Sequence, residues 1–388
     1  MQQFTIPNPI LKILERLADA GHAAYLVGGC VRDMLLGVAP HDWDICTAAR
    51  PDQVCALFPD TLDHGARHGT VTVREGGLSA EVTTFRAEGT YTDHRRPDAV
   101  RFLSDLRADL ARRDFTVNAM AMDADGVLTD PFGGQTDLEN RILRAVGEPE
   151  RRFQEDALRM LRAIRFSAQL DLSIEAETAK AIRACAPLMA SLSAERICAE
   201  LDRTLRTRYP ERLAAAQDYG LLAFPARLPW DKLHTAPEGR TARWMAFSLA
   251  LTEAGCGLSV LETLRLDKRT ALACRACAAL FQSAPRTEQT WKAAVAAHGA
   301  ETAALSAEVL SAWEGSDDAA VLRTILRRGD CCTLRELAIS GTELRRLGIQ
   351  GPEIGRTLNR LLRHVWAYPE DNQADILLTL AREEKTYG

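Results

Sequence analysis

AYLVGGCVRDMLLGVAPHDWDICT, residues 24–47, is the stretch of sequence that decides the fold. An apolar run, Ala24–Val27, is cut off by Gly28–Gly29, and a helix-like segment, Cys30–Leu36, follows. A second short run, typical of a strand, then carries Asp42 and Asp44. The stretch therefore predicts a strand, a Gly-Gly turn, a helix and a second strand with two carboxylates on it.

The two aspartates have the spacing of a metal site. Residues two apart on a strand face the same side, so Asp42 and Asp44 are expected to project together while Trp43 and Ile45 pack behind them. Paired carboxylates repel each other unless a cation lies between them. Mg²⁺ takes one or two carboxylates and completes its shell with water and substrate phosphate, so it is the expected ion. The alternative is a solvated strand edge, but the apolar neighbours favour one buried face and one polar face.

The Gly28–Gly29 turn is a candidate phosphate-binding element. A backbone without Cβ lets a phosphate approach closely, and the N–H groups at a helix N-terminus point at the anion. Arg32 follows three residues after Gly29 and adds positive charge. A tight strand–helix turn would explain the two glycines alone, and the Rossmann pattern G-x-G-x-x-G does not fit this stretch. The D-x-D pair soon after the turn favours a site for phosphate and metal together.

A hairpin is expected after the opening stretch. Two β-like runs, Thr70–Arg74 and Leu78–Arg86, are joined by Gly76–Gly77. Glu81 interrupts the second run, and a carboxylate in such a strand is costly unless it is exposed or bound to a ligand. Glu81 is therefore a possible third catalytic carboxylate, with simple exposure as the alternative.

A row of arginines follows an aspartate in EDALRMLRAIRF, residues 155–166. Neighbours three apart on a helix share a side, so one helix is expected to carry Asp156, Arg159, Arg162 and Arg165 together. A carboxylate and several guanidiniums can form hydrogen bonds with base edges and phosphates. The alternative is a solvated helix with internal ion pairs.

The bulk composition indicates an ordinary globular protein of more than one domain. The chain has 388 residues, of which 46% are hydrophobic and 26% charged. Its net charge of −5 gives no global sign of nucleic-acid binding, so any such role must come from local basic clusters. The N-terminus lacks the pattern of a signal peptide, and the sequence contains no membrane-length apolar run, so we expect a cytoplasmic protein without membrane contact.

The ten cysteines form no spaced framework, so we expect reduced thiols. Cys274 and Cys277 make a C-x-x-C in an Ala-rich helical stretch, where helix core is favoured over zinc binding. The mixed pattern of strands and helices stops near Val146, and from Glu148 onward nearly every segment has helical periodicity. We therefore expect an α/β head followed by an all-helical remainder.

Five ordered motifs resemble those of the class II tRNA nucleotidyltransferases, the bacterial CCA-adding enzymes and their poly(A) polymerase relatives. The motifs are LVGGCVRDMLLG with DWDICT, RRDFTVNAMAMD, DPFGGQTDLENRILRAVG, EDALRMLRAIRF and SAERICAELDRTL. The resemblance implies an α/β nucleotidyltransferase head of the polymerase-β-like fold, followed by an all-helical neck, body and tail. The expected domains are the catalytic head (1–146), the neck with the nucleotide-selecting helix (147–225), the body (226–316) and the tRNA-binding tail (317–388).

The resemblance also implies a role for each motif residue. The metal would bind to Asp42 and Asp44. The nucleotide would be held by Gly28, Gly29, Arg32 and one of Arg112 and Arg113. The pair Asp156 and Arg159 would recognise CTP or ATP by its Watson–Crick edge, with Arg162 and Arg165 close by.

The implied activity is template-independent addition of CCA to the 3′ end of tRNA from CTP and ATP, with release of pyrophosphate, by Mg²⁺-dependent two-metal transfer. The alternatives are a poly(A) polymerase, an enzyme that adds only CC or only A, and an inactive RNA-binding relative. An intact polar loop, Tyr91–Pro97, with His94 where glycine is frequent, favours addition of the terminal A. No obligatory protein partner is implied.

Local basic surface for tRNA is expected near the C-terminus. The candidates are Arg345, Arg346, Arg356, Arg360 and Arg363, which lie partly around the turns at Gly348 and Gly351. Exposed arginines without a nucleic-acid role are the alternative.

Overall fold

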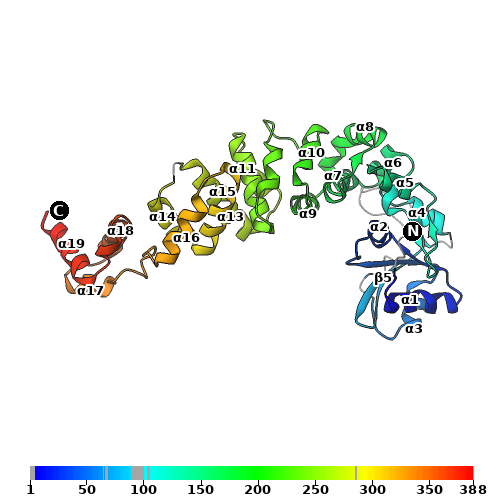
Figure 1. Cartoon of the computed structure of the whole chain (residues 1–388), viewed down its shortest axis with the longest axis horizontal. Helices are drawn as coiled ribbons and strands as arrows, with labels where there is room; N and C mark the ends of the chain where they lie inside the picture. Colours follow the sequence, from blue (N-terminus) through cyan, green and yellow to red (C-terminus); the bar gives the residue numbers. More distant parts are fainter. Residues whose placement is uncertain are drawn as a thin grey trace. The chain divides into compact units, whose positions relative to one another are not determined.

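The structure, a computed structural model, describes residues 5–63, 65, 69–88, 100–102, 105–284 and 286–387. The chain divides into two compact units, and each is described by itself (Figure 1). The first unit comprises Met1–Thr204 and Arg212–Ala223, and the second comprises Leu205–Glu211 and Phe224–Gly388. The finer division into four domains stays a prediction.

A mixed sheet forms the first part of the first unit. Within the described residues it has seven strands, in the order β3-β4-β5-β2-β1-β8-β9. These strands are β1 Ala24–Val27, β2 Trp43–Thr47, β3 Thr61–Leu62, β4 Thr70–Glu75, β5 Leu78–Thr84, β8 Ala121–Met122 and β9 Leu128–Thr129. Two short pairs lie outside it, namely antiparallel β6 Arg86–Glu88 with β7 Val100–Phe102, and parallel β10 Ile142–Leu143 with β11 Ser173–Ile174.

The opening stretch folds as the predicted strand, turn, helix and strand. Helix α2, Gly29–Leu35, joins β1 to β2, and the two strands pair antiparallel with Leu26 opposite Ile45. Asp42, expected on the second strand, lies in the bend just before it. The strand begins one residue later because its pairing with β5 starts at Trp43, which lies opposite Ala80.

The predicted hairpin is confirmed. Strands β4 and β5 pair antiparallel from Glu75 opposite Leu78 to Thr70 opposite Thr83. The second strand ends at Thr84, and Arg86 begins the separate strand β6. Since β5 also pairs with β2, the hairpin becomes part of the same sheet as the opening stretch.

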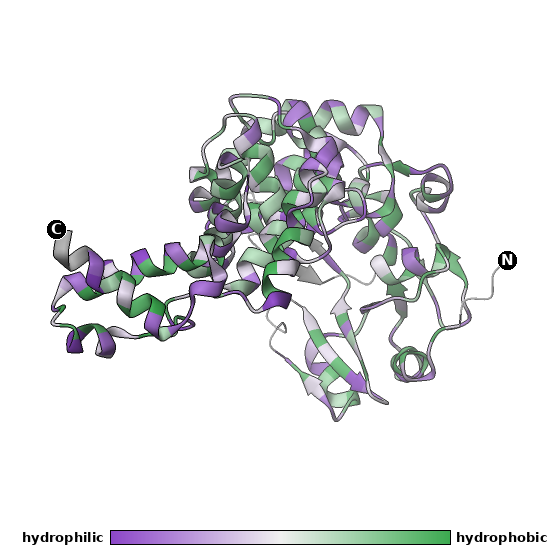
Figure 2. Ribbon diagram, turned by 60° about the vertical axis from the view of Figure 1, so that its left-hand side comes forward, coloured by the Kyte–Doolittle hydropathy of each residue, from purple (hydrophilic) through white to green (hydrophobic). Residues whose placement is uncertain are grey.

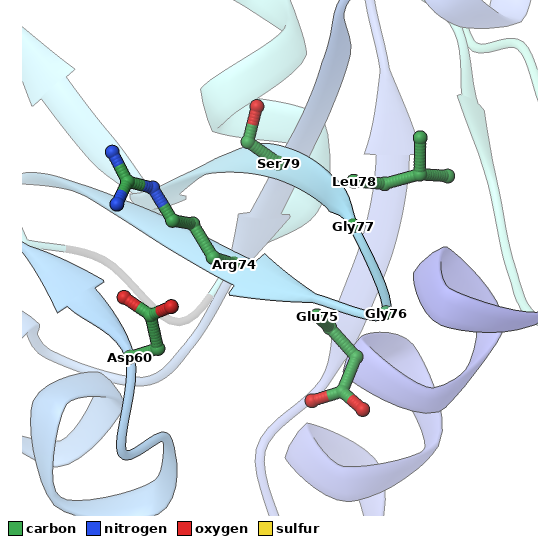
Figure 3. A pocket seen from close by; sticks show the side chains of 7 residues that line it. All are labelled: Asp60, Arg74, Glu75, Gly76, Gly77, Leu78 and Ser79. Carbon is green, nitrogen blue, oxygen red and sulfur yellow. The ribbon is translucent and has the colours of Figure 1, made fainter.

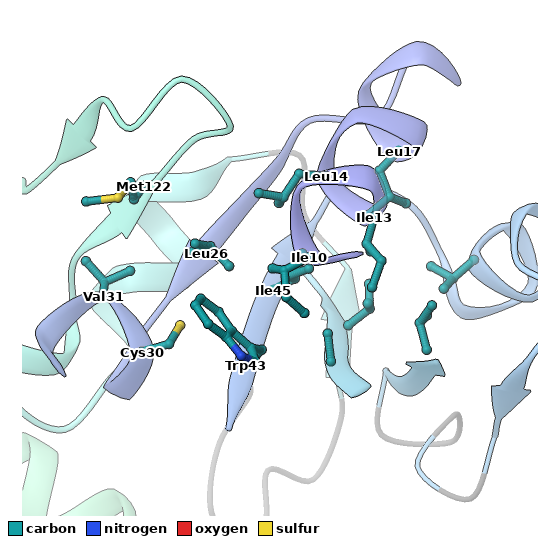
Figure 4. Close-up of a cluster of buried hydrophobic side chains, with 14 of the residues drawn as sticks. Ile10, Ile13, Leu14, Leu17, Leu26, Cys30, Val31, Trp43, Ile45 and Met122 are labelled. Carbon is teal, nitrogen blue, oxygen red and sulfur yellow. The ribbon is translucent and has the colours of Figure 1, made fainter. Parts of the chain in front are cut away.

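The core of the head lies between the sheet and helix α1, Asn8–Asp19. The buried side of this helix presents residues at helical spacing, and they pack with Trp43 and Ile45 of β2 (Figure 4). Trp43 is 7% exposed and Ile45 is 0% exposed, so the apolar neighbours of the two aspartates do form the buried face of the strand. The helix residues in this cluster are Ile10, Ile13, Leu14 and Leu17.

The rest of the described chain is largely helical, as predicted. In the first unit the helices are α3 Pro51–Leu57, α4 Leu106–Ala111, α5 Gly134–Glu139, α6 Pro149–Glu155, α7 Leu158–Leu170, α8 Ala176–Cys185, α9 Ala194–Leu205 and α10 Ala214–Asp218. In the second unit they are α11 Arg240–Glu253, α12 Ser259–Thr263, α13 Lys268–Gln282, α14 Glu288–His298, α15 Ala300–Glu314, α16 Asp318–Arg328, α17 Gly341–Arg346, α18 Pro352–Ala367 and α19 Ala374–Tyr387.

The helices of the second unit alternate hydrophobic and hydrophilic residues along their length (Figure 2). Cys274 and Cys277 lie on α13 and are both 0% exposed, which confirms their prediction as helix core. Among the helices that the structure describes, none is both long enough and apolar enough to span a membrane.

The first residue of helix α5 packs closely against the short 3-10 helix η2, Thr116–Asn118. A Cβ added to Gly134 would lie 2.2 Å from the carbonyl oxygen of Thr116, which is far closer than atoms can approach. The Thr116 hydroxyl also donates a hydrogen bond of 2.8 Å to Asp137 of α5. The DPFGG motif therefore holds η2 in place by close backbone packing.

Replacing Gly134 with Ala is expected to destabilise the protein by about 1–3 kcal/mol, because the new methyl group forces the backbone of η2 to move. Chemical denaturation measures the change in the free energy of unfolding. Gly355→Ala is the matched control, since a Cβ at this helical position meets no atom within 4 Å. Equal stability of the two variants would contradict the packing argument.

Candidate active site

The Gly28–Gly29 turn lies close to the guanidinium of Arg113 and to the carboxylate of Asp44. Gly28 has a φ of 74°, a conformation that favours glycine. A Cβ at this position would lie 2.8 Å from Nη1 of Arg113 and 3.7 Å from Oδ2 of Asp44. The absence of a side chain at position 28 thus lets a cation and a carboxylate meet at the N-terminus of α2.

Three carboxylates gather beside this turn. Asp44 on β2 is half-buried and lies next to Glu81 of the parallel strand β5, while Asp42 is exposed in the bend before β2. Burial raises the pKa of Asp44, the Arg113 guanidinium opposes this rise, and the charges of Glu81 and Asp42 add to it. Adjacent like charges are unfavourable, so this edge of the sheet has negative charge that a cation would relieve.

The carboxylates at this edge fit a divalent cation held with substrate. No group of three or more His, Cys, Asp or Glu side chains in the described ranges is arranged to hold a metal by itself. A site of two aspartates is nevertheless the usual arrangement for Mg²⁺, because substrate phosphate and water supply the other ligands. The rise in the pKa of Asp44 is the observation that supports this fit.

Arg113 is held by Asp109, a buried residue of α4 that the sequence did not suggest as part of the site. Asp109 is 0% exposed, and its Oδ2 lies 3.6 Å from Nη2 of Arg113. Its Oδ1 accepts hydrogen bonds from Nε of Arg112 at 3.0 Å and from the backbone N–H of Arg86 at 3.2 Å. Arg112 therefore supports the carboxylate, whereas Arg113 lies over the Gly28 turn.

Arg32, a predicted phosphate ligand, is buried and engaged with neighbouring side chains. Its Nε and Nη2 donate to Oδ1 of Asp33 at 2.9 and 2.7 Å, and its Nη1 donates to Oδ1 of Asn118 at 2.7 Å. The guanidinium thus fixes helix α2 against η2.

A chain of hydrogen bonds continues from Asn118 to helix α7. The Asn118 amide donates to Oδ1 of Asp114 at 3.3 Å, and Oδ2 of Asp114 accepts from Nε and Nη2 of Arg162 at 2.8 and 2.6 Å. Burial would raise the pKa of Asp114, but the Arg162 guanidinium outweighs it and holds this pKa at about 2. Asp114 therefore stays ionised at neutral pH, and it joins the head to the arginine row.

The structure corrects the predicted helix that carries both Asp156 and the arginines. Helix α6 ends at Glu155 and α7 begins at Leu158, with Asp156 in an extended conformation between them. The reason is a capping contact, because Oδ1 of Asp156 accepts a hydrogen bond of 3.1 Å from the backbone N–H of Leu158. Asp156 therefore precedes the helix that carries Arg159, Arg162 and Arg165.

Asp156 and Arg159 have different partners in this structure. Nη2 of Arg196, on α9, donates to both oxygens of Asp156 at 3.1 and 2.9 Å. Arg159 is 8% exposed, and it donates to Oε2 of Glu155 at 2.7 Å and to the carbonyl oxygen of Arg112 at 3.0 Å. The alternative of a helix with solvated arginines is therefore wrong for Arg159, which is buried and forms an ion pair with Glu155.

The last arginines of the row pack around one aromatic ring. Arg165 donates to Oε2 of Glu200 at 2.7 Å, and its Cζ lies 4.0 Å from the centre of the Phe166 ring. The Cζ atoms of Arg162 and Arg32 lie 5.3 and 5.6 Å from the same centre. Contacts between guanidiniums and an aromatic face stabilise positive charge, so Phe166 joins Arg32 of α2 to Arg162 and Arg165 of α7.

The loop Tyr91–Pro97, with His94, falls outside the described residues. A hollow in the first unit lies at the tip of the β4–β5 hairpin, and none of the predicted site residues lines it (Figure 3). Its lining residues are Asp60, Arg74, Glu75, Gly76, Gly77, Leu78 and Ser79.

The sheet, the turn and the paired carboxylates define a nucleotidyltransferase head. A family model for the poly A polymerase head domain matches residues 24–144, across the turn, the carboxylates and the Arg112–Asp114 motif. A second family model, described as the probable RNA and SrmB-binding site of polymerase A, matches residues 171–226. The class of protein is therefore a nucleotidyltransferase of the poly(A) polymerase type.

Comparisons over the whole chain specify the family. A CCA-adding enzyme from Geobacillus kaustophilus is 37% identical over 384 residues, which cover 94% of each chain. Another, from Geobacillus thermodenitrificans, is 54% identical over 195 residues, which cover 50% of this chain and 48% of that enzyme. The crystal structure of the Bacillus stearothermophilus CCA-adding enzyme with CTP superposes with a TM-score of 0.83 at 34% identity, over 99% of each chain. The chain belongs to the CCA-adding enzyme family of tRNA nucleotidyltransferases.

The ion pair between Asp114 and Arg162 is expected to make stability depend on pH. Because the folded pKa of Asp114, about 2, is below its ordinary value of 3.8, the stabilisation is complete above pH 4 and lost as the pH falls toward 2. The loss is on the order of 2 kcal/mol. Denaturant unfolding of the wild type and Asp114→Asn at pH 2 and pH 6 measures it, and parallel pH curves would contradict it.

Proposed function

We propose that the site between the Gly28 turn and helix α7 carries out template-independent addition of C, C and A to the 3′ end of tRNA. CTP and ATP are the substrates, and pyrophosphate is the product. The observation that carries this proposal is Asp44, whose pKa is raised by burial and by neighbouring carboxylates beside the glycine turn and Arg113. The family of the chain supplies the substrate class.

Enzymes of this family generally use a divalent metal, and we propose Mg²⁺ held by Asp42 and Asp44, with Glu81 as the third carboxylate. When bound, such a cation lowers the pKa of an attacking hydroxyl and neutralises charge on the departing pyrophosphate. Arg113 lies beside the turn, so the triphosphate would lie between these carboxylates and Arg113.

The turn and its arginines would hold the triphosphate. The Gly28–Gly29 backbone exposes N–H groups at the start of α2, where an anion can approach closely. Arg113 lies directly over the turn, which favours it over Arg112 as the arginine that contacts phosphate. Arg32 is paired with Asp33 and Asn118, so we propose that it orients α2 and reaches the nucleotide only through that helix.

Asp156 and Arg159 would select the base. A carboxylate accepts a hydrogen bond from an exocyclic amino group, and a guanidinium donates one to the neighbouring ring nitrogen or carbonyl. Cytosine and adenine both present an amino group beside a ring nitrogen, whereas uracil and guanine would leave these groups unmatched. Arg196 contacts both oxygens of Asp156 and would keep that carboxylate oriented.

A poly(A) polymerase is the second candidate, because the matching head model carries that description. The product distinguishes the two activities, since a CCA-adding enzyme stops after three nucleotides and a polymerase continues.

We also propose a cytoplasmic location for the CCA-adding enzyme. It is supported by ten free cysteines, of which nine are buried.

The activity is tested with tRNA that ends before CCA, after C and after CC, supplied with labelled CTP, ATP and Mg²⁺. We expect completion of CCA on each. Asp44→Asn and Asp42→Asn should each lower the rate by about a thousandfold or more, because the metal site is lost. Glu75→Gln on β4 is the matched control. Absence of incorporation by the wild type would refute the function, and active Asp44→Asn would refute the metal site.

Base selection is tested with Asp156→Ala, which should relax discrimination against UTP and GTP by about tenfold or more. Arg196→Met should have a smaller effect in the same direction, because Asp156 remains but is no longer oriented. The measurement is kcat/KM for each of the four nucleotides, with Glu150→Ala on α6 as control. Unaltered selectivity in Asp156→Ala would mean that another residue reads the base.

A further inference from the structure

Lys292 on α14 is a buried cation outside the candidate active site. Its side chain is 1% exposed, and Nζ lies 2.8 Å from Oδ2 of Asp330, whose side chain is 6% exposed. Nζ also donates a hydrogen bond of 3.2 Å to the carbonyl oxygen of Trp366. Burying a lysine is costly unless it is paired, so these contacts account for its burial.

The partners of Lys292 belong to different parts of the second unit. Asp330 follows the end of α16, and Trp366 lies in the last turn of α18. The final carbonyls of a helix have no partner within the helix, and a cation is favourable at that end. Lys292 therefore caps α18 from a separate helix.

The C-terminal helices α17, α18 and α19 have an apolar core of their own. This cluster begins at Cys331 and includes Leu344, Leu361, Val365 and Leu377. The hydrogen bond from Lys292 to Trp366 is a polar contact between α14 and α18. The indole N–H of Trp366 strengthens it with a hydrogen bond of 3.3 Å to the carbonyl oxygen of Cys332.

The helix that Lys292 caps carries a cationic face. Arg356, Arg360 and Arg363 are exposed and are spaced four and three residues apart, which places them on one side of α18. Leu361 and Val365 are 2% and 1% exposed and face the core. The contact at the end of α18 thus fixes the direction in which these arginines point relative to α14.

We propose that Lys292 is a positioning residue for RNA, which holds the arginine face of α18 at a fixed orientation for the phosphates of a folded tRNA. This inference rests on the proposed function. The candidate catalytic residues all belong to the first unit, whereas Lys292 and the arginine face belong to the second. Contacts that strengthen substrate and transition state equally change KM and leave kcat unaltered, and we expect the arginine face to act in this way.

The test compares Lys292→Met with Arg286→Met on two substrates, a full tRNA lacking CCA and a short hairpin of its acceptor stem. Arg286 is the matched control, because its side chain is also buried and pairs with Asp318 at 2.8 Å, but its partners lie outside α17, α18 and α19. We expect Lys292→Met to raise KM for the full tRNA about tenfold, with kcat and the hairpin KM unchanged. Arg286→Met should change neither KM.

A second comparison removes the arginine face itself by changing Arg356, Arg360 and Arg363 to Ala together. These exposed changes should raise KM for the full tRNA, and Lys292→Met should add nothing in their background. Asp330→Asn should also raise KM for the full tRNA, but by less than Lys292→Met. This variant replaces Lys292→Met in the test if Lys292→Met does not fold. An unchanged KM in folded Lys292→Met, or equal losses on both substrates, would overturn this inference. Wild-type protein inactive on both substrates would instead overturn the proposed function.

Discussion

The buried ion pair between Asp114 and Arg162 is the interaction on which the site depends. Its two residues are 48 positions apart, one in the head and one on α7, and they meet at 2.6 Å. Removing one partner of this pair leaves the other charge uncompensated, at a place where Asp114 is buried and Arg162 is partly buried. Through Asn118 the same carboxylate reaches Arg32 and the start of α2. The Gly28–Gly29 turn and helix α7 are thus parts of one hydrogen-bonded structure.

The charges of the site are balanced locally, although the whole chain carries −5. Asp44 lies near Arg113, which is paired with Asp109, and Arg162 of the arginine row is paired with Asp114. A buried guanidinium that already has a partner keeps its direction before a nucleotide arrives, so little ordering is needed on binding. The negative net charge therefore does not prevent the site from binding a triphosphate.

Local sequence patterns predicted the opening stretch and the hairpin well, because strand alternation and glycine turns are decided by neighbouring residues. Trp43 and Ile45 are buried as their alternation with the aspartates predicted. The break between α6 and α7 was missed, because it follows from a side-chain cap at Asp156 within a sequence that has good helical periodicity. The partners of the site residues were missed for another reason. Arg196 lies 40 positions from Asp156, and no local pattern connects them.

The close approach at Gly28 links two distant positions in the sequence. A side chain at position 28 would occupy the space of the Arg113 guanidinium, and the φ of 74° at Gly28 would add backbone strain. A larger residue at position 28 would therefore force the Arg113 guanidinium to move away from the turn, and the positive charge beside the start of α2 would move with it. Gly28 thus leaves room for the charge of Arg113 and also allows the backbone conformation of the turn.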